Sequence, residues 1–420
     1  MSWRETTLGE ITDLKRGFDL PKSQRLQGDV PVYSSSGITG SNSTAAVEGP
    51  CVITGRYGTI GEVFFSGGPC WPLNTALYST EFNGNNPRFV YYLLQTIPWQ
   101  GYTTASAVPG VNRNHVNLCP VKIPDRATQD AIVEVLDSIV DKIALNNRLN
   151  DYLEQCLLAR YDHLFRGAGT YNGTISDIGD VVGGATPSKK RPEYYCHEGI
   201  GWITPKDLSN TTNKFVAHGA DDITRVGFDS CSIKKLPAGT VLFSSRAPIG
   251  YIAIASDEVT TNQGFKSIVP HKEIGTAFVY CFLVRNKDRI ADAGSGTTFP
   301  EVSGKTMAGI ELTLPSINLC AKFEEWASPL LEEQRHLEDE NRQLEDLRDT
   351  LLPKLMSGEI DVSKVDLTQL TNNHLSGCGS FCSVCCPSGL ASEFHEWFRE
   401  HFFFGYGHLC KADLGWEDLP

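Results

Sequence analysis

The sequence predicts an α+β fold in which two related globular domains form a pseudo-twofold repeat, separated by two long helices that pair as an antiparallel coiled coil. Three observations predict this fold. The segment 1–125 recurs as 170–315. Each copy mixes short strand-like runs with one amphipathic helical run. Each copy is followed by a long stretch in which apolar residues recur three and four positions apart.

The repeat keeps its order over more than a hundred residues. Phe89–Leu94 recurs as Phe278–Leu283 at an offset of 189, whereas Arg25 in PKSQR recurs as Arg191 in PSKKR at an offset of 166. Matches at an offset of 191 are Pro109 with Pro300, Val111 with Val302 and Pro124 with Pro315. The second copy is therefore about 25 residues longer. A repeat of this length indicates two related domains, because solenoid repeats are much shorter.

Each copy is expected to open with short strands broken by Gly, Pro, Ser and Asn, and then to form one helix. We expect strands at 30–33, 51–54 and 62–65 in the first copy, and at 240–243 and 251–255 in the second. The helices are expected at 87–97 and 274–290. A last strand ends each copy at Pro124 and Pro315.

Two long helical regions follow, at 126–169 (with a linker) and 316–366. The predicted helix–helix seam contains Ile139, Ile143, Asn150, Leu153, Leu330, Leu337, Asn341 and Leu344. An Asn in a seam fixes register at a cost in stability; the alternative is that Asn150 and Asn341 face solvent. Pro329 is expected to kink the second helix or to shift its start. The linker between the first helix and the second copy is short, so an antiparallel pair is the simplest arrangement.

The net charge of −13 argues at first against a nucleic-acid partner. However, Lys/Arg and Asp/Glu number 9 and 9 in residues 1–125, and 15 and 15 in residues 170–315. The excess acid lies in the helices and the tail, so each copy can present a basic face. Charged residues near the N-terminus argue against a signal peptide, and no run is apolar enough to cross a membrane. We therefore expect a cytoplasmic protein with no membrane contact.

The segment 367–420 departs from the repeat. Its cysteines are Cys378, Cys382, Cys385, Cys386 and Cys410. The spacing Cys-x3-Cys-x2-Cys-Cys lacks the paired arrangement of a zinc module. We expect no metal site and a poorly ordered tail rich in Cys and Phe, with structural zinc as the alternative.

Catalytic motifs are not found. The segment 183–190 has the composition of a phosphate-binding loop but not its spacing. What recurs between the copies is scaffold and polar surface residues, whereas catalysis requires a cluster of acid, base or nucleophile in one place. The sequence therefore favours a binding protein with no catalytic residues.

The recurring polar residues suit a groove of DNA. Arg56 and Arg246 precede the Ile-Gly turns, and Asn74 recurs as Asn262; Arg can fork onto guanine or phosphate, and amides pair with adenine. Loops at 102–107 and 293–298, rich in Thr, Ser and Gly, are typical of phosphate contacts. The residues predicted to contact DNA are Lys22, Arg25, Arg56, Tyr57, Asn74, Thr104, Arg113, Lys189, Lys190, Arg191, Lys206, Arg246, Asn262, Gln263, Thr297 and Lys305. For each one singly, the alternative is a structural turn contact or a solvated charge.

Over residues 1–366 the chain resembles the specificity subunit of type I restriction–modification systems. The resemblance rests on the order of globular copies, prolines and long helices, and on the segments 3–11 and 351–360. It implies two target-recognition domains, 1–125 and 170–315, each reading one half of a split site in double-stranded DNA. It also implies that the helical regions set the spacing between the two halves.

The resemblance further implies partners. Two methyltransferase (M) subunits dock on the helices, and restriction (R) subunits join them. S-adenosylmethionine, ATP and Mg are then expected on the partner subunits, with no cofactor in this chain. The alternative, from a different functional class, is a coiled-coil adaptor that binds protein or glycan without reading bases.

Overall fold

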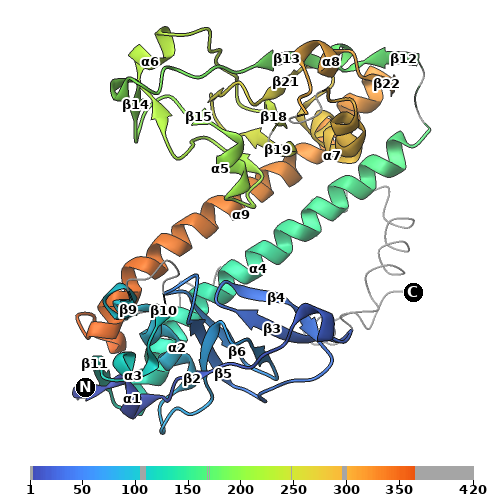
Figure 1. The fold of residues 1–420 in the computed structure, drawn as a ribbon. Helices are drawn as coiled ribbons and strands as arrows, with labels where there is room; N and C mark the ends of the chain where they lie inside the picture. The colour runs from blue at the N-terminus through green and yellow to red at the C-terminus, as the bar shows by residue number, and fades with distance from the viewer. Residues whose placement is uncertain are drawn as a thin grey trace. The chain divides into compact units, whose positions relative to one another are not determined.

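The structure is a computed structural model of the 420-residue chain and describes residues 3–104, 110–167, 169, 171–246, 248–295 and 300–364. The chain divides into two compact units: residues 1–141 with the chain from 346 onward, and residues 142–345. Both division points fall inside the longest helices, α4 (Arg126–Phe165) and α9 (Ile317–Ser357) (Figure 1). Each long helix therefore contributes residues to both units. The tail predicted at 367–420, with its cysteines, lies outside the described residues.

The first unit is built on an antiparallel sheet of order β2-β8-β5-β6. Its strands are β2 (Lys15–Arg16), β8 (Ala76–Ser79), β5 (Cys51–Gly55) and β6 (Val63–Ser66). Its other strands are β1 (Trp3–Thr7) paired with β11 (Pro120–Pro124), β9 (Thr103–Thr104) paired with β10 (Gly110–Val111), and the sheet of β4 (Gly37–Asn42), β3 (Val30–Ser34) and β7 (Trp71–Pro72). Its short helices are α1 (Leu8–Ile11), η1 (Lys22–Gln24), η2 (Trp99–Tyr102), α3 (Arg113–Val116) and η5 (Val362–Lys364).

Helix α2 (Pro87–Gln95) shows why the first unit folds where the pattern predicts. Asn86 caps it by accepting hydrogen bonds from the N–H groups of Arg88 and Phe89 at 2.8 and 3.3 Å, and Pro87 occupies the first turn. Its apolar face, including the fully buried Phe89 and Val90, joins the core of the unit. That core also takes in the start of α4 and the end of α9.

The second unit is built on a sheet of order β13-β21-β18-β19-β16. Its strands are β13 (Gly179–Gly183), β21 (Lys266–Pro270), β18 (Val241–Ser245), β19 (Ile249–Ala255) and β16 (Phe215–Val216). The paired strands are β12 (Tyr171–Thr174) with β22 (Glu311–Leu314), β14 (Tyr195–Cys196) with β17 (Asp222–Ile223), and β15 (Trp202–Ile203) with β20 (Thr260–Thr261). The helices are η3 (Ile175–Asp177), η4 (Pro192–Tyr194), α5 (Pro205–Ser209), α6 (Arg225–Asp229), α7 (Thr276–Asp292) and α8 (Gly304–Ala308).

The two sheets are the same structure with one added strand. Strands β2, β8, β5 and β6 correspond in order to β13, β21, β18 and β19, and β16 is added next to β19. The pairing registers of the strands identify equivalent residues in the two domains. The residue number in the second domain exceeds that in the first by 167 at β2 and β13, by 170 at β3 and β15, and by 189 from β5 and β18 onward. The additional length thus lies mainly in residues 204–240, which form α5, β16, β17 and α6. The predicted α+β repeat is confirmed.

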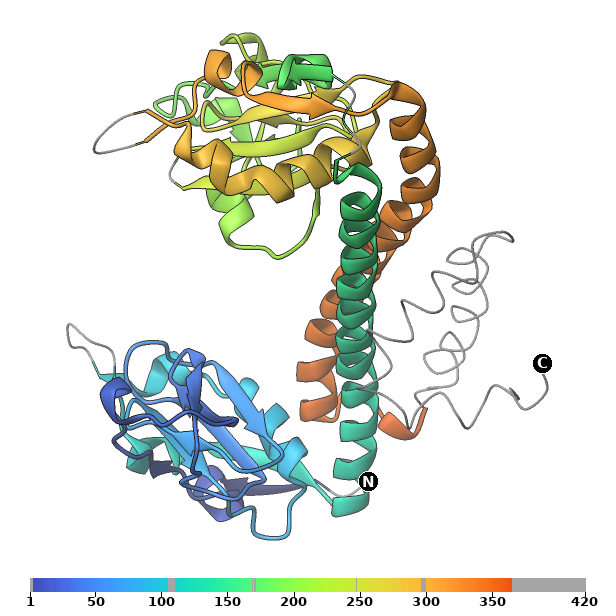
Figure 2. The same ribbon diagram turned by 90° about the vertical axis from the view of Figure 1, so that its right-hand side faces the viewer.

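Within the second unit, α4 and α9 form the predicted antiparallel pair. Lys142 Nζ lies 3.1 Å from Glu340, Asn146 Nδ2 donates to Asn341 Oδ1 at 2.9 Å, and Gln334 Nε2 donates to the Asn150 carbonyl at 3.1 Å. Between Asn146 and Asn150 on α4 the partner on α9 moves back from Asn341 to Gln334, which fixes the antiparallel direction. Within this unit the parts of the two helices that belong to it run alongside each other in both views (Figures 1 and 2).

The residues predicted for the seam differ in burial. Those that are buried are Ile139, Leu153, Leu330, Leu337, Asn341 and Leu344. Ile143 and Asn150 are half-buried. Asn341 faces its partner helix, because its amide donates to Asn147 Oδ1 at 2.8 Å as well as accepting from Asn146. Pro329 lies inside α9, which begins at Ile317, so it does not mark the start of the helix.

The added strand β16 is fastened to the helix pair by a buried polar network. Lys214 is 8% exposed, and its Nζ donates to Gln334 Oε1 at 2.6 Å and pairs with Glu154. Glu338 accepts the N–H groups of Lys214 and Phe215 at 2.8 and 3.0 Å. Burial raises the pKa of Glu338, and these N–H groups partly oppose that shift. The network positions the segment that only the second copy possesses.

Candidate nucleic-acid interface

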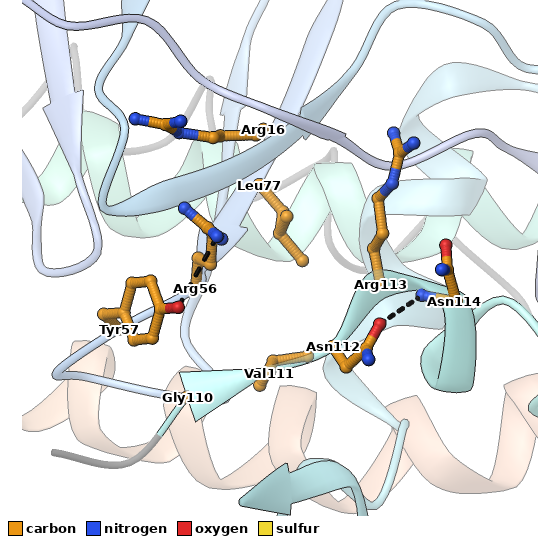
Figure 3. Close-up of a pocket in the computed structure, with 9 residues that line it drawn as sticks. All are labelled: Arg16, Arg56, Tyr57, Leu77, Gly110, Val111, Asn112, Arg113 and Asn114. Carbon is orange, nitrogen blue, oxygen red and sulfur yellow. Dashed lines mark hydrogen bonds between the residues drawn. The ribbon is translucent and has the colours of Figure 1, made fainter.

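The first domain has a hollow of about 400 Å³ where strand β5 ends (Figure 3). Its lining residues are Arg16, Arg56, Tyr57, Leu77, Gly110, Val111, Asn112, Arg113 and Asn114. The three arginines come from β2, from the turn after β5 and from α3, so separate elements bring three guanidinium groups to one place. Asn112 caps α3 by accepting the Asn114 N–H at 3.0 Å, which leaves its amide NH2 group as a donor.

Arg56 is held in the hollow by its neighbours. Its guanidinium carbon lies 4.6 Å from the centre of the Tyr57 ring, and its Nη1 donates to the Asn74 carbonyl at 3.4 Å. Stacking on an aromatic ring and a backbone bond orient the planar fork while leaving other N–H groups available. Tyr57 itself is 43% exposed, so the stacked pair is accessible.

The remaining predicted residues of the first domain lie outside this hollow. Arg25 donates to the Thr39 carbonyl at 2.8 Å, which is a structural turn contact, and Lys22 lies exposed in η1. The Asn74 side chain donates to Asp19 and does not line the hollow. Thr104 ends β9, and its side chain lies outside the described residues, as do residues 105–107 of the predicted loop.

The second domain also has a hollow, of about 330 Å³, and it shares with the first hollow the position of Tyr57 and Arg246. It is lined by Thr186, Lys189, Trp202, Thr204, Pro205, Lys206, Arg246, Asn262, Gln263 and Gly264. The structure therefore brings together five of the residues predicted to bind DNA in this domain: Lys189, Lys206, Arg246, Asn262 and Gln263. One wall is α5, which belongs to the added segment.

The other predicted residues of the second domain lie apart from this hollow. Lys190 is exposed, and Arg191 pairs with Glu193 at 3.7 Å and lies 5.7 Å from the ring centre of Tyr194. Lys305 is exposed on α8. Thr297 lies outside the described residues, with residues 296 and 298 of the predicted 293–298 loop.

Backbone hydrogen bonds correct the matching of residues between the domains. Arg56 N–H donates to the Thr75 carbonyl at 2.9 Å, and the equivalent bond is Ser245 N–H to the Gly264 carbonyl at 2.7 Å. The donor and the acceptor in the second domain both have residue numbers 189 higher than their counterparts in the first. Arg56 therefore corresponds to Ser245, and Tyr57 corresponds to Arg246. Matching Arg56 with Arg246 was wrong by one residue.

The same correction applies to the amides. Leu73 N–H donates to the Tyr33 carbonyl at 2.7 Å, and Asn262 N–H donates to the Ile203 carbonyl at 3.0 Å. Asn262 therefore corresponds to Leu73, and Gln263 corresponds to Asn74. Asn74 and Asn262 are the same residue type one position out of register, and the backbone contacts define the equivalent positions.

Both hollows are cationic although the chain is acidic overall. Among the described residues that line them there is no Asp or Glu. Carboxylates lie next to two of the cations, with Asp19 3.3 Å from Arg16 and Glu301 3.6 Å from Arg246. Open hollows lined by guanidinium, ammonium and amide donors suit phosphates and base edges.

Sequence reasoning missed several lining residues. They are Arg16, Asn112 and Asn114 in the first hollow and Thr186, Trp202 and Thr204 in the second. A usable signal was present for two of them, because Arg16 precedes Gly17 and Thr186 lies two residues after Gly184. An added Cβ on Gly17 would lie 2.2 Å from the Leu73 carbonyl oxygen, and one on Gly184 would lie 2.2 Å from the equivalent oxygen of Asn262.

Within the described part of the chain, no group of three or more His, Cys, Asp or Glu side chains is placed to hold a metal ion. None of the helices searched there is long and apolar enough to cross a membrane.

A duplicated α+β domain, each copy followed by a long helix and each with one cationic hollow, defines a class of protein with two similar binding domains. The family model of the type I restriction modification DNA specificity domain matches the chain twice, at residues 1–155 and 170–319. The chain belongs to this family, and it is a DNA-recognition subunit rather than the enzyme.

Named relatives agree with this assignment. The chain is 43% identical over 145 residues to the specificity subunit of the type I restriction enzyme MjaIX of Methanocaldococcus jannaschii, which covers 34% of this chain and 33% of that one. It is 23% identical to the HindI specificity subunit of Haemophilus influenzae, over 85% of this chain and 99% of that one. The crystal structure of the S subunit of a type I restriction–modification system from M. genitalium matches with a TM-score of 0.57 at 16% identity, over 85% and 96% of the two chains. That last likeness concerns the fold.

Proposed function

We propose that this specificity subunit reads a bipartite site in double-stranded DNA, with one half contacted by each globular domain. The observation that carries the proposal is the pair of cationic hollows. Each lies where the central strand, β5 or β18, ends, and each gathers Arg or Lys with amide donors. Guanidinium and amide groups on a rigid sheet edge are suited to base edges and phosphates of a groove.

We propose further that the chain directs the chemistry of partners. Two methyltransferase subunits would dock on the long helices and restriction subunits would join them, as expected for the family. S-adenosylmethionine, ATP and Mg would then be bound by those partners, with none in this chain. A target adenine rotated out of the duplex would enter the methyltransferase pocket. The complex would act in the cytoplasm, where the host DNA lies.

Competition binding tests the DNA proposal. The full chain, produced with its methyltransferase subunit, is mixed with a labelled duplex carrying the motif found by methylome sequencing of the host. Unlabelled duplexes altered in either half should compete at least tenfold less well than the intact motif. Equal competition by all duplexes would exclude base readout and leave the adaptor that binds protein or glycan.

Salt dependence provides a second readout of the same complex. Phosphate contacts by Lys and Arg release counterions, so the logarithm of the affinity should fall linearly with the logarithm of the salt concentration. Replacing both Arg113 and Lys206 by Ala should reduce that slope by about one for each phosphate contact that is lost. An unchanged slope would show that the hollows do not meet the DNA backbone.

A further inference from the structure

Two side-chain pairs occupy the same place in the two domains. The equivalent backbone bonds are Phe18 N–H to the Pro72 carbonyl at 2.8 Å and Ala185 N–H to the Thr261 carbonyl at 2.9 Å. The residues that follow, Asp19 and Thr186, are therefore equivalent. Each makes a side-chain hydrogen bond to the amide residue at the equivalent turn, Asn74 or Gln263. We call these two the buttress pairs.

The buttress pairs have opposite hydrogen-bond polarity. Asn74 Nδ2 donates to a carboxylate oxygen of Asp19, which can only accept, so the oxygen of the Asn74 amide stays available. In the second domain the Thr186 hydroxyl donates to Gln263 Oε1, so the NH2 group of that amide stays available. The same position thus presents an acceptor in one domain and a donor in the other.

Neighbouring groups in the second domain reinforce its donor character. The Asn262 side-chain oxygen accepts the Gly264 N–H at 2.8 Å, which leaves its NH2 group as a donor too. Arg246 and Lys206 line the same hollow and can only donate. A ligand in this hollow therefore meets several donors.

Neighbouring groups in the first domain reinforce the acceptor character of its pair. The Asp19 side chain is 68% exposed and adds carboxylate oxygens next to Asn74. Arg16 lies 3.3 Å from it, so one charge is partly balanced and the carboxylate is held in place. An amino group is the complementary ligand.

We infer that the buttress residues Asp19 and Thr186 determine base specificity by choosing which end of the amide faces DNA. In the major groove guanine (O6 and N7) and thymine (O4) offer acceptors and no amino group, whereas cytosine N4 and adenine N6 are donors. The second domain accordingly reads guanine or thymine at Gln263. The first domain reads cytosine or adenine at Asn74. This inference rests on the proposed function, because it assumes that the two amides meet base edges.

Reciprocal exchange of the buttress residues tests the inference. Thr186→Asp should turn the Gln263 NH2 group toward the new carboxylate and expose Oε1. Asp19→Thr should do the reverse to Asn74. Each variant, as the full chain with its methyltransferase subunit, selects duplexes from a library randomised across the motif.

Thr186→Asp should change one position of one half-site from guanine or thymine to cytosine or adenine, with a preference of about tenfold, and leave the other half unchanged. Asp19→Thr should change one position of the other half-site in the opposite sense. Thr186→Ser keeps the hydroxyl and should select the same bases as the wild type. Melting temperature and binding of the methyltransferase subunit verify that each variant is folded.

The two exchanges also distinguish an effect of the changed net charge from an effect of the changed hydrogen-bond polarity. Thr186→Asp adds a negative charge near DNA and Asp19→Thr removes one, so a pure charge effect would lower and raise overall affinity without changing the selected bases. Unchanged base preference in both folded variants would overturn the inference while leaving the proposed function intact. A wild-type chain that selects no sequence at all would overturn both.

Discussion

The two globular domains share one backbone arrangement and differ in the side chains mounted on it. The four strands of the first sheet all have counterparts in the second, and Gly17 and Gly184 make the same close approach to a carbonyl oxygen. Yet Arg56 stands where the second domain has the buried Ser245, and Arg246 stands where the first has Tyr57. The repeat thus keeps its backbone contacts and changes the groups at the edge of the sheet, which is the pattern expected of two readers with different targets.

The second walls of the hollows differ even more. The first hollow is completed by α3 with Arg113, and the second by α5 with Lys206. The segment that supplies α5 also supplies β16, and Lys214 fastens that strand to the helix pair. The added length therefore changes the lining of the hollow while the four common strands keep their order.

Lengthening the two long helices, α4 and α9, should have the largest effect on DNA binding. One heptad inserted in both helices, between 141 and 142 in α4 and between 345 and 346 in α9, adds about 10 Å, or roughly three base pairs. If the domains read separately, both half-site sequences should persist with a longer spacer, and binding to the original site should be lost. Library selection measures this. An unchanged spacer with intact binding would mean that the helices do not set the distance.

Substituting the matched glycines tests whether the backbones are equivalent. Gly17→Ala and Gly184→Ala each place a Cβ 2.2 Å from a backbone oxygen, so each should reduce the free energy of unfolding by about 1–3 kcal/mol. Gly68→Ala is the control, because no described atom lies within 4 Å of its added Cβ. Denaturant unfolding measures all three. Tolerance at one glycine alone would break the correspondence between the domains.

Removing one guanidinium from each hollow should have a smaller and localised effect. Arg56→Ala and Arg246→Ala should each weaken binding by about 1–3 kcal/mol and relax specificity in one half-site only. Lys22→Ala, outside the hollow, should weaken binding to all duplexes alike if it meets phosphate. Titrations against duplexes altered in one half or the other distinguish these outcomes. Relaxation in both halves by one substitution would contradict separate reading.

Removing residues 371–420 should have the smallest effect. The repeat and the helices that carry both hollows end before this segment, so DNA affinity and half-site preference are expected to stay within twofold of the full chain. Titration with the wild-type motif measures this. Loss of binding would assign the tail a role in recognition.

Much of the fold could be predicted because its signals extend over many residues. The repeated runs at Phe89–Leu94 and Phe278–Leu283 fall in α2 and α7. The recurrence of apolar residues three and four positions apart predicts both long helices. Single residues at the sheet edge carry a weaker signal. A side chain can reach the same hollow from either of two neighbouring backbone positions, so matching Arg56 to Arg246 misplaced the register by one.

The wall supplied by α5 could not be predicted for a different reason. Its position depends on the pairing of β16 with β19 and on the buried network around Lys214, which join residues far apart in sequence. The hydrogen-bond polarity of Gln263 likewise depends on its contact with Thr186, 77 residues away. Neither contact leaves a local pattern.

Exchange of one whole domain tests the central claim most directly. Residues 1–125 are replaced by those of a relative with a different target, and the methylated motif is read by methylome sequencing of cells that carry the chimaera and its methyltransferase subunit. The account predicts that one half of the motif changes while the other half and the spacer length remain. A change in both halves, or a motif with no division into two halves, would contradict it.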